Sequence, residues 1–299
     1  MKRVLITGEN SYIGTSVEQW LKKDSELFEV TVVSVRGNDW RSQNWKEYDC
    51  IFHVAGIAHA DTGKITEEEK ARYYQINRDL SFDVAEKFKA DRQGKKSQFI
   101  YMSSIIVYDD KTNVSKQRVI TSQTKPNPSS FYGDSKLQAE LKLSELEDDG
   151  FTLAVVRPPM IYGKGSKGNY SMLSRLALKT PVFPKFDNER SMLHISNLSE
   201  FIRLLIMEEI SGIFFPQNKE YIKTSDLVKI VADTHNHKLI LTPLFNWGII
   251  LLSLIPGKVG KLTNKAFGNL VYDKKISTEK IDNYQIIDFE ESIKLTEES

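Results

Sequence analysis

Two side chains suited to proton transfer, Tyr132 and Lys136, stand four residues apart at the start of a helical pattern. Residues at this spacing project from the same face of a helix. A free tyrosine titrates near pH ~10, and a neighbouring ammonium lowers that pKa by stabilising the phenolate. We therefore expect Lys136 to lower the pKa of Tyr132, and the pair to exchange a proton with a substrate oxygen.

Two hydroxyls end the preceding apolar run, which extends from Phe99 to Ser104. Ligands bind at the carboxyl ends of the strands in open α/β sheets. We expect Ser104 to hydrogen-bond a carbonyl or alkoxide oxygen of the substrate, with Ser103 as the near alternative. Tyrosine and lysine at this spacing also occur on ordinary helices. The catalytic interpretation of Ser104, Tyr132 and Lys136 therefore depends on the elements that position them.

Strand and helix patterns alternate along the first half of the chain. Short β-branched runs predict buried strands at Arg3–Thr7, Val30–Val35, Cys50–Val54, Gln98–Met102 and Leu153–Val156. Longer patterns between them predict helices at Tyr12–Lys23, Tyr73–Ala90 and Ser135–Asp148. Such alternation requires right-handed crossovers. We therefore expect an α/β fold with a Rossmann-type, doubly wound parallel sheet.

The first strand runs into a glycine-containing turn and then into a helix, which is the architecture of a dinucleotide site. Gly8 permits the tight turn, and Gly14 allows close packing of helix and strand. Ser11 replaces the middle glycine of the usual motif, but it is small and its hydroxyl can donate to a phosphate. The predicted cofactor contacts here are Gly8, Ser11, Tyr12, Ile13 and Gly14. A plain structural loop is the alternative.

The residue just past the second predicted strand indicates which nicotinamide cofactor is bound. An NAD enzyme of this fold places an acidic residue there to bond the ribose, whereas this chain has Arg36. A guanidinium suits the 2′-phosphate of NADP through charge-assisted contacts. NADP(H) is therefore favoured. The alternative is that Arg36 is solvated and Asp39 bonds the ribose of NAD(H).

The regular alternation of strands and helices breaks after Pro158-Pro159, where glycines and prolines mark loops. We expect residues 1–157 to form the cofactor domain. A helical pattern at Leu193–Met207 indicates that residues 191–215 return to it. Residues 158–190 and 216–299 then form a smaller C-terminal lobe that binds the substrate.

Several motifs together resemble the extended short-chain dehydrogenase/reductases of the NAD-dependent epimerase/dehydratase family. Thr7 with the turn that follows resembles their TGxxGxxG motif, and His53-Val54-Ala55-Gly56 resembles HxAG. Arg157-Pro158-Pro159-Met160-Ile161-Tyr162-Gly163 resembles RPxxxYG, and the segment from Arg190 to Leu198 resembles RxxxHVxDLA. The likeness extends through nearly the whole chain.

This resemblance implies further site residues that spacing alone does not single out. Implied cofactor contacts are Ala55, Gly56, Asn77, Pro159 and Ile161, together with Tyr132 and Lys136 themselves. Implied substrate contacts are Asn169 and Arg190, beside Ser103 and Ser104. His59 either faces the hexose or is a solvated loop residue.

The late segment Leu262 to Tyr272 and the RPPMIYG stretch look most like reductases of bacterial capsular and O-antigen pathways. The resemblance implies NAD(P)H-dependent reduction at C4 of a UDP-2-acetamido-2,6-dideoxy-4-keto-hexose. The product is UDP-N-acetylfucosamine or UDP-N-acetylquinovosamine. Ile105-Ile106 stands where the related dehydratases carry an acidic pair, which argues against dehydration.

Two other functions remain open at the level of the sequence. A UDP-hexose 4-epimerase uses the same tyrosine, lysine and serine with permanently bound NAD. A regulator that binds NADP(H) without catalysis has the same fold, although intact Ser104, Tyr132 and Lys136 argue against it. The C4 stereochemistry and the oligomeric state, a homodimer included, are not determined by the sequence.

The composition limits the remaining classes of function. Lys+Arg 41 against Asp+Glu 40 leaves no bulk charge for nucleic acid. Cys50 is the single cysteine, and no cluster has metal-ligand spacing, so we expect neither a disulfide nor a metal. The apolar start ends at Gly8, too early for a signal peptide, which favours a cytoplasmic location.

The most apolar stretch, Trp247 to Ile255, is too short to span a membrane. We expect a buried helix there. The alternative is peripheral membrane attachment or a partner surface through residues 244–255, supported by the lysines that follow.

Overall fold

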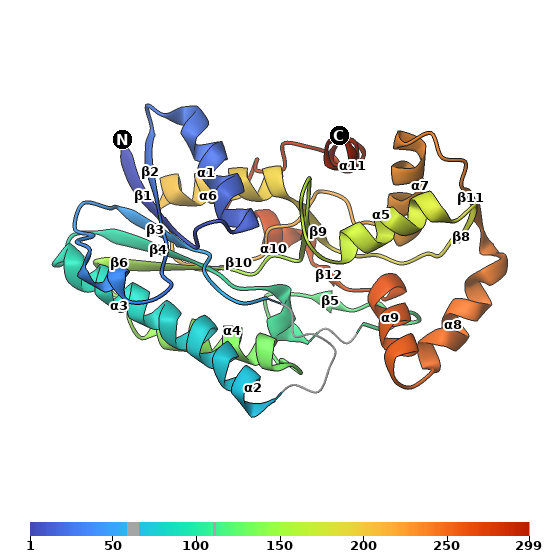
Figure 1. The fold of residues 1–299 in the computed structure, drawn as a ribbon, viewed down its shortest axis with the longest axis horizontal. Helices are drawn as coiled ribbons and strands as arrows, with labels where there is room; N and C mark the ends of the chain where they lie inside the picture. The colour runs from blue at the N-terminus through green and yellow to red at the C-terminus, as the bar shows by residue number, and fades with distance from the viewer. Residues whose placement is uncertain (59–65, 110–111, 299) are drawn as a thin grey trace. The chain divides into compact units, whose positions relative to one another are not determined.

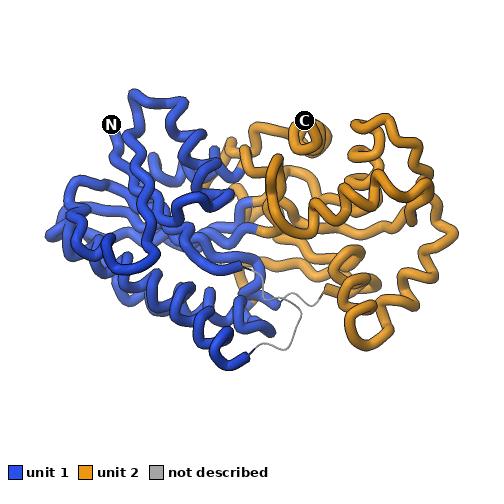
Figure 2. Tube along the Cα trace, viewed as in Figure 1, with its two compact units in different colours: residues 1–109, 125–158, 198–216 blue, residues 110–124, 159–197, 217–299 orange. Residues whose placement is uncertain are grey.

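The computed structural model describes residues 1–58, 66–109 and 112–298. The chain forms two compact units (Figure 2). The first comprises residues 1–109, 125–158 and 198–216, and the second comprises residues 110–124, 159–197 and 217–299. Residues 110–124 belong to the second unit, where the strand β5 (Val119–Ile120) pairs with β12 (Val271–Tyr272). A cofactor role for one unit and a substrate role for the other stay predictions.

The first unit is built on a six-stranded sheet. Its strands are β1 (Lys2–Thr7), β2 (Phe28–Val33), β3 (Cys50–His53), β4 (Ser97–Met102), β6 (Phe151–Val156) and β10 (Gly212–Phe214). Their order is β10-β6-β4-β3-β1-β2, and every neighbouring pair is parallel. The predicted Rossmann-type α/β fold is therefore confirmed. The order reverses between β1 and β3, which is where ligands bind in such sheets.

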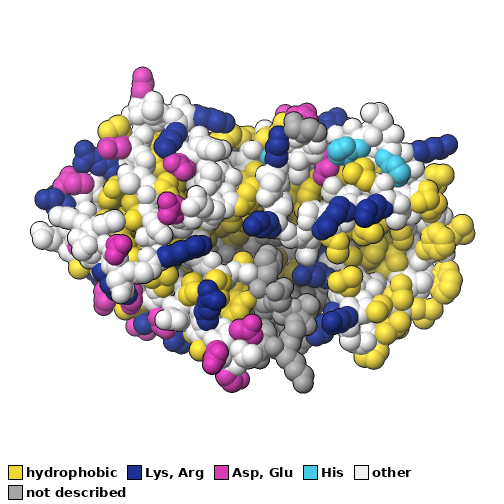
Figure 3. All heavy atoms as spheres, in the orientation of Figure 1, with side chains coloured by type: hydrophobic (Ala, Val, Ile, Leu, Met, Phe, Trp, Pro, Cys, Tyr) yellow, Lys and Arg dark blue, Asp and Glu magenta, His cyan; other side chains and the backbone are white. Residues whose placement is uncertain are grey.

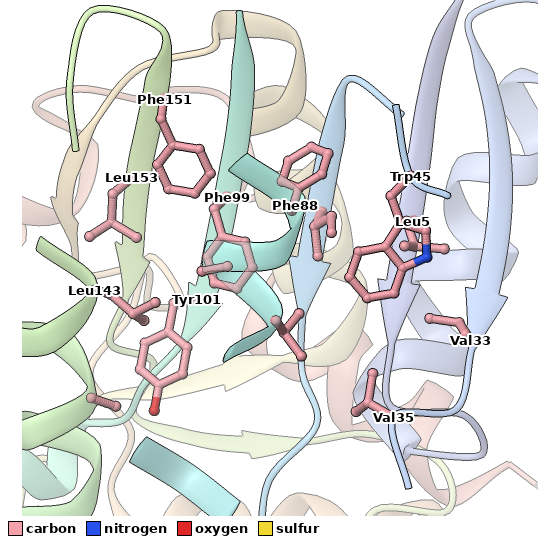
Figure 4. Close-up of a cluster of buried hydrophobic side chains, with 14 of the residues drawn as sticks. Leu5, Val33, Val35, Trp45, Phe88, Phe99, Tyr101, Leu143, Phe151 and Leu153 are labelled. Atoms are coloured by element: carbon pink, nitrogen blue, oxygen red, sulfur yellow. The ribbon is translucent and has the colours of Figure 1, made fainter. Parts of the chain in front are cut away.

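Helices cover both faces of this sheet (Figure 1). They are α1 (Tyr12–Leu21), α2 (Glu67–Tyr74), α3 (Leu80–Arg92), α4 (Phe131–Ser144) and α6 (Ile195–Glu208), with short turns η1 (Lys22–Asp24), η2 (Asp39–Ser42), η3 (Gln75–Asp79) and η4 (Ile105–Tyr108). The strands are nearly continuous apolar runs because both of their faces are buried. On the face toward α3 and α4, Phe88 and Leu143 pack with Phe99 and Phe151 (Figure 4).

Two helix boundaries differ from the sequence prediction for local reasons. The predicted helix Tyr73–Ala90 is interrupted by the π-helical turn η3. The helix α4 starts four residues before the predicted Ser135, because the Ser130 side chain accepts a hydrogen bond from Gly133 N at 3.1 Å and caps it. Tyr132 therefore lies in the first turn of α4.

The second unit contains three two-stranded parallel sheets and several helices. The sheets pair β7 (Met160–Tyr162) with β9 (Met192–His194), β8 (Val182–Pro184) with β11 (Ile240–Thr242), and β5 (Val119–Ile120) with β12 (Val271–Tyr272). The helices are α5 (Asn169–Lys179), α7 (Thr224–Thr234), α8 (Asn246–Leu254), α9 (Lys258–Phe267), α10 (Lys274–Thr278) and α11 (Phe289–Glu297), with the turn η5 (Pro243–Phe245). The start of the predicted helix Leu193–Met207 is instead part of β9.

The apolar helix α8 is not buried, so the expectation for residues 247–255 is wrong. Of its large apolar side chains, only Ile249 is buried, packing near Phe186. Trp247 is 67% exposed and Leu254 is 73% exposed. In the part of the chain that the structure describes, no helix combines the length and the apolar character needed to cross a membrane.

Candidate active site

The end of β1 and the start of α1 form a backbone cradle. Gly8 has φ +107°, a conformation that side chains disfavour, and a Cβ there would lie 2.9 Å from Ala55 N. The Ser11 hydroxyl accepts a hydrogen bond from Gly14 N at 3.0 Å and caps α1. Gly8, Ser11, Gly14 and Ala55 thus meet at the reversal point of the sheet. Free N–H groups of the first helical turn at Tyr12 favour an anion there.

The charged residues beyond β2 are all exposed, but they differ in their contacts. Arg36 is exposed, and it makes no ion pair or hydrogen bond among the described residues. Asp39 begins the turn η2 and is also exposed. In contrast, the nearby Arg41 is paired with Asp83 at 2.5 Å. The guanidinium of Arg36 is therefore available to a ligand.

Asn77 is fully buried in the π-helical turn η3 and joins three segments. Its Oδ1 accepts from Ile57 N at 2.9 Å, and its Nδ2 donates to Ile57 O at 3.1 Å. Nδ2 also donates to Ser135 Oγ on α4 at 3.0 Å. A Cβ on Gly56 would lie 3.0 Å from Asn77 Oδ1. Asn77 therefore fixes the loop after β3 against the helix of Tyr132.

Lys136 is buried beneath this loop. Its Nζ donates to Met102 O at 2.8 Å and lies 4.7 Å from the centre of the Tyr101 ring. A Cβ on Gly56 would lie 3.3 Å from Lys136 Nζ, so the absence of a side chain there leaves room above the ammonium. Burial lowers the pKa of Lys136 to about 8, although Glu140 one turn later opposes the change.

Tyr132 is half-buried and shares a hydrogen bond with Ser104. Its ring lies 6.3 Å from that of Tyr73. Burial raises the pKa of Tyr132 to about 12, and the Ser104 bond only partly offsets this rise. The expectation that Lys136 lowers this pKa is therefore not met in the protein alone, because desolvation dominates. Tyr132 is held protonated at neutral pH.

Ser103, the alternative to Ser104, is used elsewhere. It is buried, and its Oγ donates to Glu140 Oε1. Arg157 Nε donates to both oxygens of Glu140, at 3.1 and 3.2 Å, and Arg157 also bonds the Tyr108 hydroxyl. Sequence reasoning missed this buried ion pair. Its available signals were the spacing of four between Lys136 and Glu140 and the arginine in the RPPMIYG stretch.

Two predicted substrate residues line one pocket of the second unit. Asn169 at the start of α5 and Arg190 meet there with Lys265 of α9, and the remaining lining residues are Met160, Met172, Leu173, Met192, Ile222, Thr224, Leu227 and Ala266. Arg190 Nη1 donates to Lys265 O, and burial lowers the pKa of Arg190 to about 10. The guanidinium therefore stays charged at neutral pH in a largely apolar pocket.

Three predicted residues lie elsewhere. Pro159 is buried and Ile161 is half-buried in β7, both in the second unit. Their contact with a cofactor stays a prediction. His59 lies outside the described residues.

A family model described as the RmlD substrate binding domain matches residues 1–243. A UDP-glucose 4-epimerase of Vibrio cholerae is 27% identical, over 91% of this chain and 87% of that protein. A UDP-2-acetamido-2,6-beta-L-arabino-hexul-4-ose reductase of Pseudomonas aeruginosa is 28% identical, over 56% of this chain and 38% of that protein.

Solved structures share the fold at lower identity. A dTDP-4-dehydrorhamnose reductase of Bacillus anthracis, in complex with NADP, has a TM-score of 0.71 and 19% identity, covering 99% of each chain. A UDP-glucuronic acid 4-epimerase of Bacillus cereus, in complex with NAD, has a TM-score of 0.72 and 15% identity, covering 98% of this chain and 94% of that one. Both cofactors thus occur among proteins of this fold.

Proposed function

The chain belongs to the RmlD substrate binding domain family, and we propose that it is an NAD(P)-dependent nucleotide-sugar oxidoreductase that works as a reductase. Its proposed substrate is a UDP-2-acetamido-2,6-dideoxy-4-keto-hexose, reduced at C4 to UDP-N-acetylfucosamine or UDP-N-acetylquinovosamine. The named reductase from P. aeruginosa supports this substrate class. The resemblance to capsular and O-antigen reductases favours a role in surface-polysaccharide synthesis.

The observation that carries the proposal is the protonated Tyr132 hydrogen-bonded to Ser104 at the carboxyl end of β4. Reduction of a ketone creates an alkoxide, which is more basic than a phenolate. A tyrosine with a pKa raised to about 12 still donates to such an oxygen and is a poor base at neutral pH. Ser104 positions and polarises the same oxygen by donating to it.

The first unit fits a dinucleotide cofactor. Gly8 leaves room where a Cβ would press on Ala55, and Gly56 leaves room above Lys136 Nζ. We assign the diphosphate to the start of α1, the 2′-phosphate of NADP to Arg36, and the nicotinamide ribose to Lys136. When bound, the reduced nicotinamide supplies the hydride. Asn77 holds the loop that contains Gly56 against α4 through its hydrogen bonds to Ile57 and Ser135.

The proposed place for the UDP part of the substrate is the pocket of the second unit that Asn169 and Arg190 line. Arg190 keeps its charge, and among the described residues its guanidinium forms a hydrogen bond only through Nη1, to Lys265 O. We assign Arg190 to the diphosphate and Asn169 to the sugar nucleotide. An arginine fork recognises phosphate oxygens in a geometry that a lysine does not reproduce.

A UDP-hexose 4-epimerase is the second candidate, favoured by the V. cholerae relative that matches 91% of this chain. An epimerase first abstracts a proton from the C4 hydroxyl, which needs Tyr132 as a base. For that step the bound oxidised nicotinamide and Lys136 would have to lower the Tyr132 pKa, which is raised in the protein alone.

The test is incubation of the purified protein with UDP-4-keto-6-deoxy-N-acetylglucosamine and NADPH. We expect loss of NADPH absorbance in proportion to a product whose C4 configuration is read by NMR. UDP-N-acetylglucosamine and UDP-glucose serve as control substrates and should leave the absorbance unchanged. Tightly bound NAD after purification, together with interconversion of UDP-hexoses and no NADPH loss, would instead establish the epimerase.

The cofactor preference depends on Arg36. We expect Arg36→Ala to raise the KM for NADPH by about 10- to 100-fold, since one charge-assisted contact to a phosphate is lost. The KM for NADH should change little. Initial rates with both cofactors measure this, and Arg41→Ala, which removes a nearby arginine paired with Asp83, is the matched control. Equal effects on NADPH and NADH would argue that Arg36 does not contact the 2′-phosphate.

A further inference from the structure

The helices α8 and α9 form a hairpin, residues 246–267, that exposes an unusual amount of apolar surface. Of the 22 large hydrophobic side chains exposed in the described chain, ten lie between residues 244 and 262. They are Leu244, Phe245, Trp247, Ile250, Leu251, Leu252, Leu254, Ile255, Val259 and Leu262. Figure 3 shows hydrophobic side chains gathered over this region. Contiguous exposed apolar patches of this kind mark surfaces that bind another protein or a membrane.

The hairpin is anchored by contacts between its two helices and with the core of its unit. Asn264 Nδ2 donates to Ser253 O at 2.9 Å and ties the two helices together. A Cβ on Gly260 would lie 2.1 Å from Ile255 O, so only glycine permits this close approach. Phe267 packs its ring 5.7 Å from those of Phe183 and Phe186. The core of the unit thus holds the apolar face outward.

The charge of the hairpin indicates which kind of partner its exposed surface binds. No acidic residue occurs between Asp233 and Asp273, although the whole chain has nearly equal numbers of acids and bases. Lys258, Lys261 and Lys265 follow the spacing i, i+3, i+7, which places them on one face of α9. The exposed Val259 and Leu262 form an adjacent stripe. Apolar residues beside lysines suit a membrane interface with anionic headgroups.

We propose that the α8–α9 hairpin binds the surface of an anionic lipid bilayer, inserting the apolar side chains of α8 while the lysines of α9 contact the headgroups. With nine residues, α8 is too short to span and lies in the interface. Trp247 suits the headgroup level, where tryptophan is enriched. A second copy of the chain fits less well, because a two-fold interface would bring the lysine faces together.

The test is flotation of the full-length protein with vesicles. We expect binding to vesicles of phosphatidylcholine mixed with phosphatidylglycerol and much weaker binding to phosphatidylcholine alone. Added salt should reduce the binding, because it screens the lysine contacts. Absence of flotation with the anionic vesicles would overturn the proposal, as would equal binding to both kinds of vesicle.

Matched variants locate the surface. Leu251→Glu should weaken vesicle binding at least about tenfold, because an apolar contact is replaced by a charge. Leu141→Glu is the control, since Leu141 on α4 in the first unit is exposed to the same extent, 55%. Both side chains are exposed, so folding should be retained, and thermal unfolding checks this. Equal binding by the two variants would overturn the assignment of the hairpin.

The same variants distinguish a second copy from a lipid surface. The molar mass of the wild type and of Leu251→Glu is measured by light scattering. A wild-type dimer that Leu251→Glu converts to monomers, with no flotation of either, would assign the patch to self-association and reject the lipid proposal. The inference does not depend on the proposed function, because flotation is read without substrate or cofactor.

Discussion

Replacing Tyr132 by phenylalanine is expected to lower kcat for ketone reduction by about 10²- to 10⁴-fold, the usual contribution of a positioned general acid. The substitution removes the hydroxyl that bonds Ser104 and keeps the aromatic ring beside Tyr73. Binding of NADPH, followed by its fluorescence, should change little. Loss of one hydrogen bond should lower the free energy of unfolding by only about 1 kcal/mol.

The matched control for this change is Tyr74→Phe. The Tyr74 hydroxyl at the end of α2 donates to Asp134 of α4 at 2.6 Å, so this variant likewise removes one tyrosine hydroxyl that is hydrogen-bonded, here to the helix that carries Tyr132. It should keep the kcat of the wild type. Full activity of Tyr132→Phe, or equal losses in both variants, would contradict the assignment of Tyr132 as the proton donor.

The sequence was sufficient for those features that local patterns determine. Both faces of the central strands are buried, so their apolar runs were continuous and easily recognised. The turn from β1 to α1 needs glycine at Gly8, where φ is positive, and this requirement is visible in the residue type. The spacing of Tyr132 and Lys136 fixed their common face, although the cap at Ser130 placed the start of α4 earlier than predicted.

Features that depend on packing between distant segments could not be predicted. The pKa of Tyr132 was expected to fall beside Lys136 and the positive nicotinamide of an oxidised cofactor; in the protein alone it is raised, because burial removes water from the phenol. The Glu140–Arg157 ion pair joins α4 to the residue after β6. The position of each residue gives a signal of its own, but neither signal indicates that the two residues are paired. The exposure of Trp247 was missed for the same reason, since an apolar run reveals composition and not the surface against which it packs.

The substitution Lys136→Met is expected to lower the rate of reduction and to change how the stability of the protein depends on pH. We expect reduction to slow by about 10²- to 10⁴-fold, because the ammonium proposed to hold the ribose and support the proton transfer is lost. The stability effect should depend on pH. Burial lowers the pKa of Lys136 to about 8 in the folded protein, whereas an unfolded lysine titrates near ~10.4. Between these values the unfolded chain binds more protons, so this group makes unfolding less favourable as the pH rises.

The free energy of unfolding of the wild type should therefore rise relative to Lys136→Met by roughly 3 kcal/mol between pH 7 and pH 10.5. Urea denaturation of both proteins at the two pH values measures the difference, and other titrating groups cancel because both proteins contain them. Lys142→Met on the same helix is the control, since Lys142 lies 3.8 Å from Asp79 and is partly exposed. A constant difference between wild type and Lys136→Met across this range would show that burial does not lower the pKa of Lys136.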